Sequence, residues 1–121
     1  MQFLCLIHVD RALEAAMTPA EREVFERENR EYGEWLADGR STMFSSLHEP
    51  ETATLIRSRG DKLAMTDGPY VETKEHLAGF VVMDARDRNE AIEIMRKCPV
   101  ARIGTIEVRA SNYVSPSARR D

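Results

Sequence analysis

Two stretches of the chain, residues 2–9 and 77–85, are apolar at nearly every position. Short runs rich in Leu, Ile, Val and Phe predict β-strands, and the absence of a polar face indicates burial on both sides. In a third run, residues 103–108, Ile106 and Val108 share one face. Its opposite face carries Thr105, Glu107 and Arg109. That face is either an exposed edge or the polar lining of a cleft.

Helical patterns fill the two longer gaps between these strands. Thr18 is followed by Pro and by Glu at the third helical position, which is a capping box with proline at the first turn. We expect a helix over residues 19–38, closed by Gly39. A second helix should start after the cap residue Asp87 and end before Pro99.

The long predicted helix has an apolar face that is interrupted by polar residues. Phe25, Tyr32 and Leu36 fall within a narrow arc at helical spacing, and Glu28 and Asn29 lie between them. A carboxylate on an apolar helix face is costly to bury unless it is paired or borders a cleft. Two interpretations of Glu28 therefore stay open, a side chain that reaches solvent at the helix edge and a cleft carboxylate.

The middle of the chain predicts strands joined by turns. Residues 40–47 form a second strand, and residues 52–58 and 62–66 pair as a hairpin. A polar segment follows over residues 66–75, where Asp-Gly-Pro marks a sharp turn. We expect this turn to be structural, with a positive φ at Gly68.

The predicted order is strand, helix, strand, inserted hairpin, strand, helix, strand. The fold class is therefore α+β, a ferredoxin-like βαββαβ arrangement with an inserted β-hairpin, in which both helices lie on one face of an antiparallel sheet. The other face has no element to cover it, which predicts a homodimer. Residues 1–112 should form one domain and residues 113–121 a flexible C-terminal tail.

The turn segment also carries a family resemblance. The residues in question are Asp67-Gly68-Pro69-Tyr70, then Glu72-Thr73-Lys74-Glu75, then Gly79-Phe80, with Gly104-Thr105-Ile106-Glu107-Val108-Arg109 at the end. They resemble the DGPF proteins of the YCII-related family, with Tyr where Phe is usual. The resemblance implies a ferredoxin-like domain that dimerises into an α/β barrel. It implies no established activity, since most of that family is uncharacterised.

Two functions remain open under this resemblance. DGPF relatives often accompany sigma factors of the extracytoplasmic-function type, which suits a small-ligand-binding or regulatory accessory protein. Some relatives are lyase-like, so the alternative is a lyase or dehydrochlorinase type of enzyme with acid/base chemistry in the helix–sheet cleft. Shorter relatives place a His near Glu28 or Asn29 and an Asp near Lys97 or Cys98. This chain has neither, so their pair cannot be transferred.

The candidate residues follow from these patterns. Glu28 is the candidate catalytic group, with Lys74 or Arg109 as a cation that could pair with it. An unknown small molecule is the expected ligand. The candidate ligand-binding residues are His8, Tyr32, Glu72, Lys74, Glu107 and Arg109.

Composition and residue spacing argue against several classes of protein function. A net charge of −4 argues against a general nucleic-acid binder. Cys5, Cys98 and the histidines have no metal spacing, and no cofactor motif occurs, so we expect neither metal nor cofactor. The first apolar run is too short for a signal or a membrane span. The sequence therefore predicts a reduced, cytoplasmic protein without membrane contact.

Overall fold

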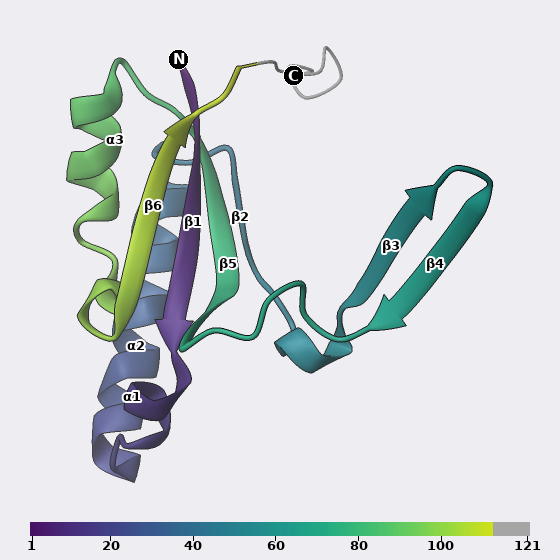
Figure 1. Cartoon of the computed structure of the whole chain (residues 1–121). Helices are drawn as coiled ribbons and strands as arrows, with labels where there is room; N and C mark the ends of the chain where they lie inside the picture. The colour runs from purple at the N-terminus through teal and green to yellow at the C-terminus, as the bar shows by residue number, and fades with distance from the viewer. Residues whose placement is uncertain (113–121) are drawn as a thin grey trace.

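The computed structural model describes residues 1–112. The predicted strands and helices are present, with two short 3₁₀ helices and a single helical turn added (Figure 1). The elements are β1 (Gln2–Asp10), α1 (Arg11–Ala15), α2 (Pro19–Ala37), β2 (Met43–Ser46), η1 (Pro50–Thr52), β3 (Thr54–Arg59), β4 (Lys62–Asp67), β5 (Glu75–Asp84), α3 (Arg88–Met95), η2 (Pro99–Arg102) and β6 (Gly104–Ala110).

The main sheet has four strands in the order β2-β5-β1-β6, and every pair is antiparallel. The two long helices, α2 and α3, lie on the same side of this sheet (Figure 1). With β3 and β4 set apart as a hairpin, this is the ferredoxin-like α+β fold that the sequence predicts. The register of β1 against β5 shifts between Ile7 and His8, which is a bulge near the end of β1.

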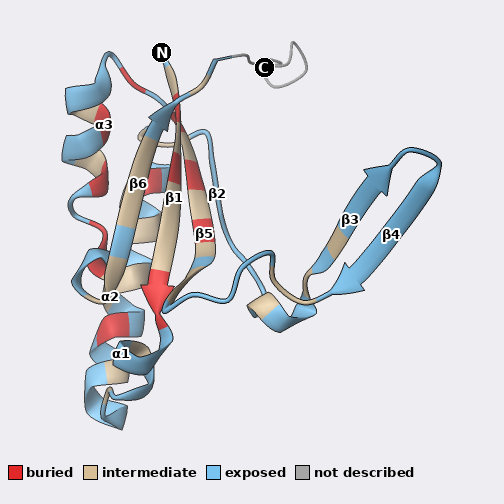
Figure 2. Ribbon diagram, in the orientation of Figure 1, coloured by how far each residue is buried: buried red, intermediate tan, exposed pale blue. Residues whose placement is uncertain are grey.

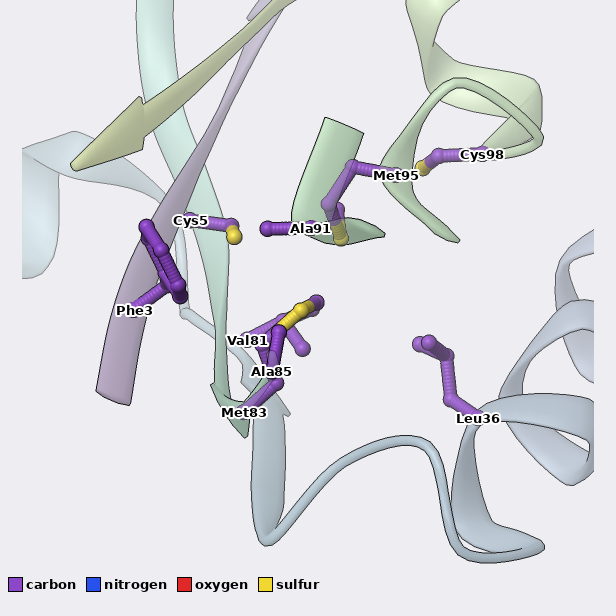
Figure 3. Packing of buried hydrophobic residues seen from close by; sticks show 9 residues of the cluster. All are labelled: Phe3, Cys5, Leu36, Val81, Met83, Ala85, Ala91, Met95 and Cys98. Carbon is purple, nitrogen blue, oxygen red and sulfur yellow. The ribbon is translucent and has the colours of Figure 1, made fainter. Parts of the chain in front are cut away.

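The core lies between the sheet and the helices. From β1 it takes Phe3 and Cys5, and from β5 it takes Val81 and Met83, all at most 1% exposed. They pack with residues of α2, α3 and the segments on either side of α3 (Figures 2 and 3). Those partners are Leu36, Ala85, Ala91, Met95 and Cys98. The residues that alternate with them along β1 and β5 point to the helix-free face and are only half-buried.

Local signals explain where the helices begin and end. Thr18 and Glu21 exchange the two capping-box hydrogen bonds, at 3.1 and 2.9 Å. Asp87 accepts from the backbone N–H of Glu90 at the start of α3. The predicted stop at Gly39 is confirmed, because this glycine follows α2 with a φ of 77°.

The predicted second strand was too long. Residues 40–47 were expected to be extended, but only Met43–Ser46 pair with β5. Arg40 and Ser41 instead satisfy carbonyl groups at the end of α2, including that of Leu36. The carbonyls that a helix end leaves open therefore decide where β2 begins.

The hairpin formed by β3 and β4 projects from the domain (Figure 1). Its residues are exposed except Leu55, which is half-buried. The segment that returns from the hairpin to β5 turns at Gly68, whose φ is 110° as predicted. Its N–H donates to the carbonyl of Ala53 over 2.7 Å, which ties the two ends of the hairpin together.

Two further expectations concern the chain as a whole. The flexible tail predicted over residues 113–121 lies outside the described residues. Across residues 1–112, no helix is long and apolar enough to cross a membrane.

Candidate functional site

A cavity of about 630 Å³ lies between α2 and the strands β5 and β2. We call it the helix–sheet cleft. Most of its wall is aliphatic or aromatic, and its size is within the range of small-molecule sites. The apolar side chains that define it are Phe25, Tyr32, Leu36, Phe44, Val81 and Val100.

Two glycines shape this cleft. Gly33 lies on α2, and a Cβ built there would be 3.5 Å from the ring of Phe44 on β2. Because Gly33 has no side chain, the space between α2 and β2 stays open. Gly79 on β5 also lines the cleft, and a Cβ there would come within 2.7 Å of the Ser45 carbonyl. The absence of a side chain at Gly79 therefore allows β2 to pair closely with β5.

Two titratable side chains in the cleft, Tyr32 and Cys98, are held in their neutral forms. The Tyr32 hydroxyl donates to the Ile94 carbonyl over 2.8 Å, and burial raises its pKa. Burial also raises the pKa of the Cys98 thiol. Tyr32 therefore contributes an aromatic surface to the cleft, while its hydroxyl joins α2 to the end of α3.

The polar groups of the cleft come from α1, α2 and β2. Asn29 and Arg30 of α2 line it together with Glu14 of α1 and Ser46 of β2. Arg30 is exposed, whereas Asn29 is half-buried. An apolar wall with a few polar groups suits a ligand that has an apolar body and a polar substituent.

Glu28 is paired at the surface beside this cleft. Its carboxylate accepts two hydrogen bonds from Arg102 of η2, at 2.7 and 3.3 Å. The expected cations, Lys74 and Arg109, were the wrong partners, because the turn after α3 brings Arg102 beside α2. The Glu28 side chain is 37% exposed and borders a separate, shallow hollow of about 420 Å³.

The other predicted residues lie away from the helix–sheet cleft. On the helix-free face, His8 Nε2 is 3.4 Å from a carboxylate oxygen of Glu107, which also accepts from Arg109. Hydrogen bonding from Arg109 holds the pKa of Glu107 below its usual value. In the turn segment, Lys74 pairs with the buried Asp10 at 3.4 Å, and Glu72 lines a small cavity.

The sequence interpretation missed three residues that shape the helix–sheet cleft, Asn29, Gly33 and Phe44. A signal for two of them was available, because Phe25, Asn29 and Gly33 follow one another at i, i+4 spacing and so share a face of α2. Phe44 could not be assigned, because its position depends on the pairing of β2 with β5. Within the described residues, no three His, Cys, Asp or Glu side chains are arranged to hold a metal ion.

The chain is 39% identical over 66 residues to an uncharacterized protein of Rhizobium meliloti (strain 1021), a match that covers 53% of this chain and 52% of the relative. This match therefore spans about half the length of the relative. Among solved structures it is similar to the 5-chloro-2-hydroxyhydroquinone dehydrochlorinase of Burkholderia phenoliruptrix AC1100 in complex with 2,5-dihydroxybenzoquinone. That similarity has a TM-score of 0.49 at 12% identity and covers 94% of this chain and 96% of that one.

A family model described as the YCII-related domain matches residues 1–111. Because this match spans nearly the whole chain, the protein belongs to the YCII-related family.

Proposed function

We propose that this protein binds a small, largely apolar molecule in the helix–sheet cleft and acts as a ligand-binding or regulatory accessory protein. The observation that carries the proposal is a cavity of about 630 Å³ with an aromatic and aliphatic wall and polar groups from only a few positions. A ligand there would place its apolar body against Phe25 and Phe44 and its polar substituent toward Asn29 and Arg30.

The state of the nearby titratable groups supports binding over acid/base chemistry. Tyr32 already donates its hydroxyl proton to a backbone carbonyl, and the Cys98 thiol has a raised pKa. The Glu28 carboxylate forms an ion pair with Arg102 and does not line the cleft. An elimination reaction requires a group that can accept a proton from the substrate. Among the described residues that line the cleft, Glu14 of α1 is the one carboxylate, so the lyase-type alternative would depend on that group alone and receives less support.

The proposal also covers the association of the protein and its location in the cell. We propose that two copies associate through the helix-free face, where half-buried Leu4, Leu6 and Val82 and exposed Met43 supply apolar surface. In a regulatory role, an occupied cleft would change how α2 packs, and a partner protein could detect this change. We place the protein in the cytoplasm, in keeping with its two free cysteines.

Position 33 provides the test, since it controls the free volume of the cleft. Wild type, Gly33→Ala and Gly33→Leu should be screened against small aromatic and carboxylate compounds by thermal shift. A ligand raises the melting temperature by mass action. Both variants should keep the fold, because Ala and Leu favour helix more than Gly does.

The two variants should differ in ligand binding. Ala makes only ordinary van der Waals contact with Phe44, so Gly33→Ala should keep the thermal shift of wild type. The Leu side chain should fill the cleft and remove that shift. If a ligand of wild type stabilises Gly33→Leu equally well, its site is elsewhere and the proposal fails.

A further inference from the structure

The hairpin of β3 and β4 forms a two-stranded sheet that does not pair with any strand of the main sheet. We call this hairpin, residues 54–67, the arm. It projects away from α2 and α3 (Figure 1). A two-stranded hairpin without further packing is at best marginally stable in water. The arm therefore lacks, within its own chain, the packing that such a hairpin normally needs.

The two faces of the arm differ in character. Ile56 pairs with Met65 and Ser58 pairs with Leu63, and residues that pair across strands or alternate along one share a face. One face therefore presents Ile56, Leu63 and Met65 together, with exposed fractions of 68%, 66% and 66%. Single exposed apolar residues are ordinary, but a cluster of three on a projecting element indicates an interaction surface.

The reverse face of the arm is basic. It carries Arg57, Arg59 and Lys62, and none of the three forms an ion pair with a residue in the range 1–112. Charges without a partner are costly to bury, so this face should stay in water while the apolar face is covered. The arm has three basic and two acidic residues, a net charge of +1. Because the whole chain carries −4, the remainder carries −5, which favours contact between the arm and the body of a second copy.

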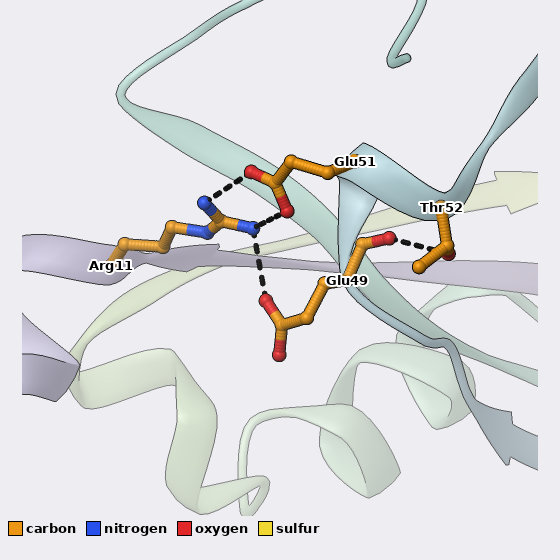
Figure 4. A network of polar contacts seen from close by, with 4 residues as sticks. All are labelled: Arg11, Glu49, Glu51 and Thr52. Atoms are coloured by element: carbon orange, nitrogen blue, oxygen red, sulfur yellow. Dashed lines mark hydrogen bonds and ion pairs between the residues drawn. The ribbon is translucent and has the colours of Figure 1, made fainter. Parts of the chain in front are cut away.

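The base of the arm is fixed to the main domain. The Gly68 N–H donates to the Ala53 carbonyl over 2.7 Å, which joins the two ends of the arm. In η1, just before the arm, Glu51 accepts from Arg11 at 2.6 and 2.8 Å, and Glu49 accepts from it at 2.9 Å (Figure 4). A bidentate contact fixes orientation as well as distance. The arm therefore leaves the domain in a defined direction, which lowers the entropy lost when it packs on a partner.

Apolar surface joins the base of the arm to the helix-free face. A cavity of about 590 Å³ lies between them, lined by Leu55 of β3, Leu77 of β5 and His8 of β1. The connecting segments contribute further exposed apolar side chains to its wall, namely Leu47, Tyr70 and Val71. A molecule that covers the helix-free face would therefore reach the arm along the same surface.

Two apolar surfaces of this chain are thus left without cover, the apolar face of the arm and the helix-free face. A two-fold dimer uses the same patch on both copies, so a contact between these two surfaces is made twice. A stable interface takes about 800 Å² from each partner. Three side chains of the arm are too few for that area, whereas the arm and the helix-free face together offer much more. A second copy is the partner that covers both surfaces at once.

We propose that the arm of each copy packs Ile56, Leu63 and Met65 against the helix-free face of the other copy, with its basic face toward water. This inference rests on the dimer proposed above. It is independent of the ligand proposed for the helix–sheet cleft.

Two neighbouring positions on β4 provide a matched test. Met65 lies on the apolar face and Ala64 on the basic face, and both are exposed. Met65→Glu should weaken the dimer by at least about tenfold, because it removes apolar area from the contact and places a charge there. Ala64→Glu should keep the dissociation constant within about threefold of wild type, because its side chain faces water. Sedimentation equilibrium measures the constants, and circular dichroism establishes that each variant keeps its fold.

A third variant separates this inference from the dimer itself. Met43→Glu changes the helix-free face but not the arm, and it should weaken the dimer as well. If Met65→Glu keeps the wild-type constant while Met43→Glu does not, the dimer stands and the arm has no part in it. The inference also fails if Ala64→Glu weakens the dimer as much as Met65→Glu, or if Met43→Glu has no effect. A wild-type protein that stays monomeric at millimolar concentration would contradict both the dimer and the arm contact.

Photo-cross-linking establishes where the arm packs. Met65→Cys is labelled with benzophenone maleimide, while the buried Cys5 and Cys98 stay unlabelled, and is mixed with ¹⁵N-labelled wild type. Cross-linked peptides of mixed isotope composition should join position 65 to β1, β2, β5 or β6 of the other copy. The inference is overturned if the cross-links stay within one chain, or if they reach α2 or α3 instead.

Discussion

The two faces of the main sheet differ although the same strands form both. Along β5, Met83 points to the helices and is fully buried, whereas its neighbour Val82 points to the helix-free face and is half-buried. The helix-covered face obtains its cover from its own chain. The helix-free face has similarly apolar residues without that cover. The difference shows that an apolar strand pattern predicts burial but does not say which chain supplies the cover.

The largest effect should come from deleting side chains on the two faces of β5. Met83→Ala removes a fully buried side chain and should cost about 2–5 kcal/mol of unfolding free energy. Val82→Ala, on the other face, should cost about 1 kcal/mol or less in a monomer, since much less apolar area is lost. Urea denaturation at low and high protein concentration measures both.

Concentration dependence makes this pair of variants a test of the proposed dimer. If a second copy covers the helix-free face, the cost of Val82→Ala should rise with protein concentration while that of Met83→Ala stays constant. The dimer would be contradicted if the cost of Val82→Ala stayed the same at every protein concentration and light scattering gave a monomer mass. The helix-free face would then be uncovered in the native state.

The effect of changing the turn between β4 and β5, at Gly68, should be next in size. Gly68→Val places a β-branched residue at a φ of 110° and should cost about 1–3 kcal/mol. No heavy atom lies within 4 Å of a Cβ at Gly68, so the cost comes from the backbone alone. Gly68→Asn, which tolerates positive φ better, is the control. Equal melting temperatures for Gly68→Val and wild type would remove the structural role of this turn.

Stability at low pH should depend on the charged network that Arg11 forms with Glu49 and Glu51 (Figure 4). The hydrogen bond from Arg11 lowers the pKa of Glu51 to about 2, from an ordinary value of 4.5. A lowered folded-state pKa stabilises the protein above the unfolded value, and this contribution is lost as the pH falls from about 4.5 toward about 2. Glu51→Gln should therefore flatten the fall in stability across that window. Glu34→Gln, at an exposed carboxylate without an ion pair among residues 1–112, should not.

Local features of the fold could be predicted from the sequence because their causes are local. Thr18 and Glu21 form the expected capping box, and Gly68 has the expected positive φ. Those patterns depend on residues within one turn of each other. The extent of β2 could not be obtained in this way, because it depends on which residues of β5 remain to be paired and on how Ser41 satisfies the end of α2.

The site residues depended on long-range geometry and were predicted less well. The partner of Glu28 is 74 residues away and sits on a 3₁₀ turn that no pattern indicated. His8 pairs with Leu77 and His76 pairs with Val9, because the register of β1 against β5 shifts between Ile7 and His8. A one-residue slip would turn these side chains to the other face. Spacing alone therefore could not place the two histidines.

The ionisation of Cys5 should have the smallest effect on stability. The reactivity of cysteine thiols also compares the two faces directly. Cys5 is fully buried on the helix-covered face, and burial raises its pKa to about 11 from 9.0. The stability linked to this raised pKa is complete below pH 9.0 and is lost as the pH rises toward about 11. At pH 8, Cys5 should therefore be protonated and should react with iodoacetamide only after unfolding.

A cysteine on the helix-free face should behave in the opposite way. Met43 pairs with Val82 on that face and is 53% exposed, so Met43→Cys should react at once in the folded monomer while Cys5 and Cys98 do not. If two copies associate through this face, the reaction of Met43→Cys should slow as the protein concentration rises, and urea should restore it. Rapid labelling of Cys5 in the native protein would mean that the helix-covered face opens readily, and the contrast between the two faces would then be lost.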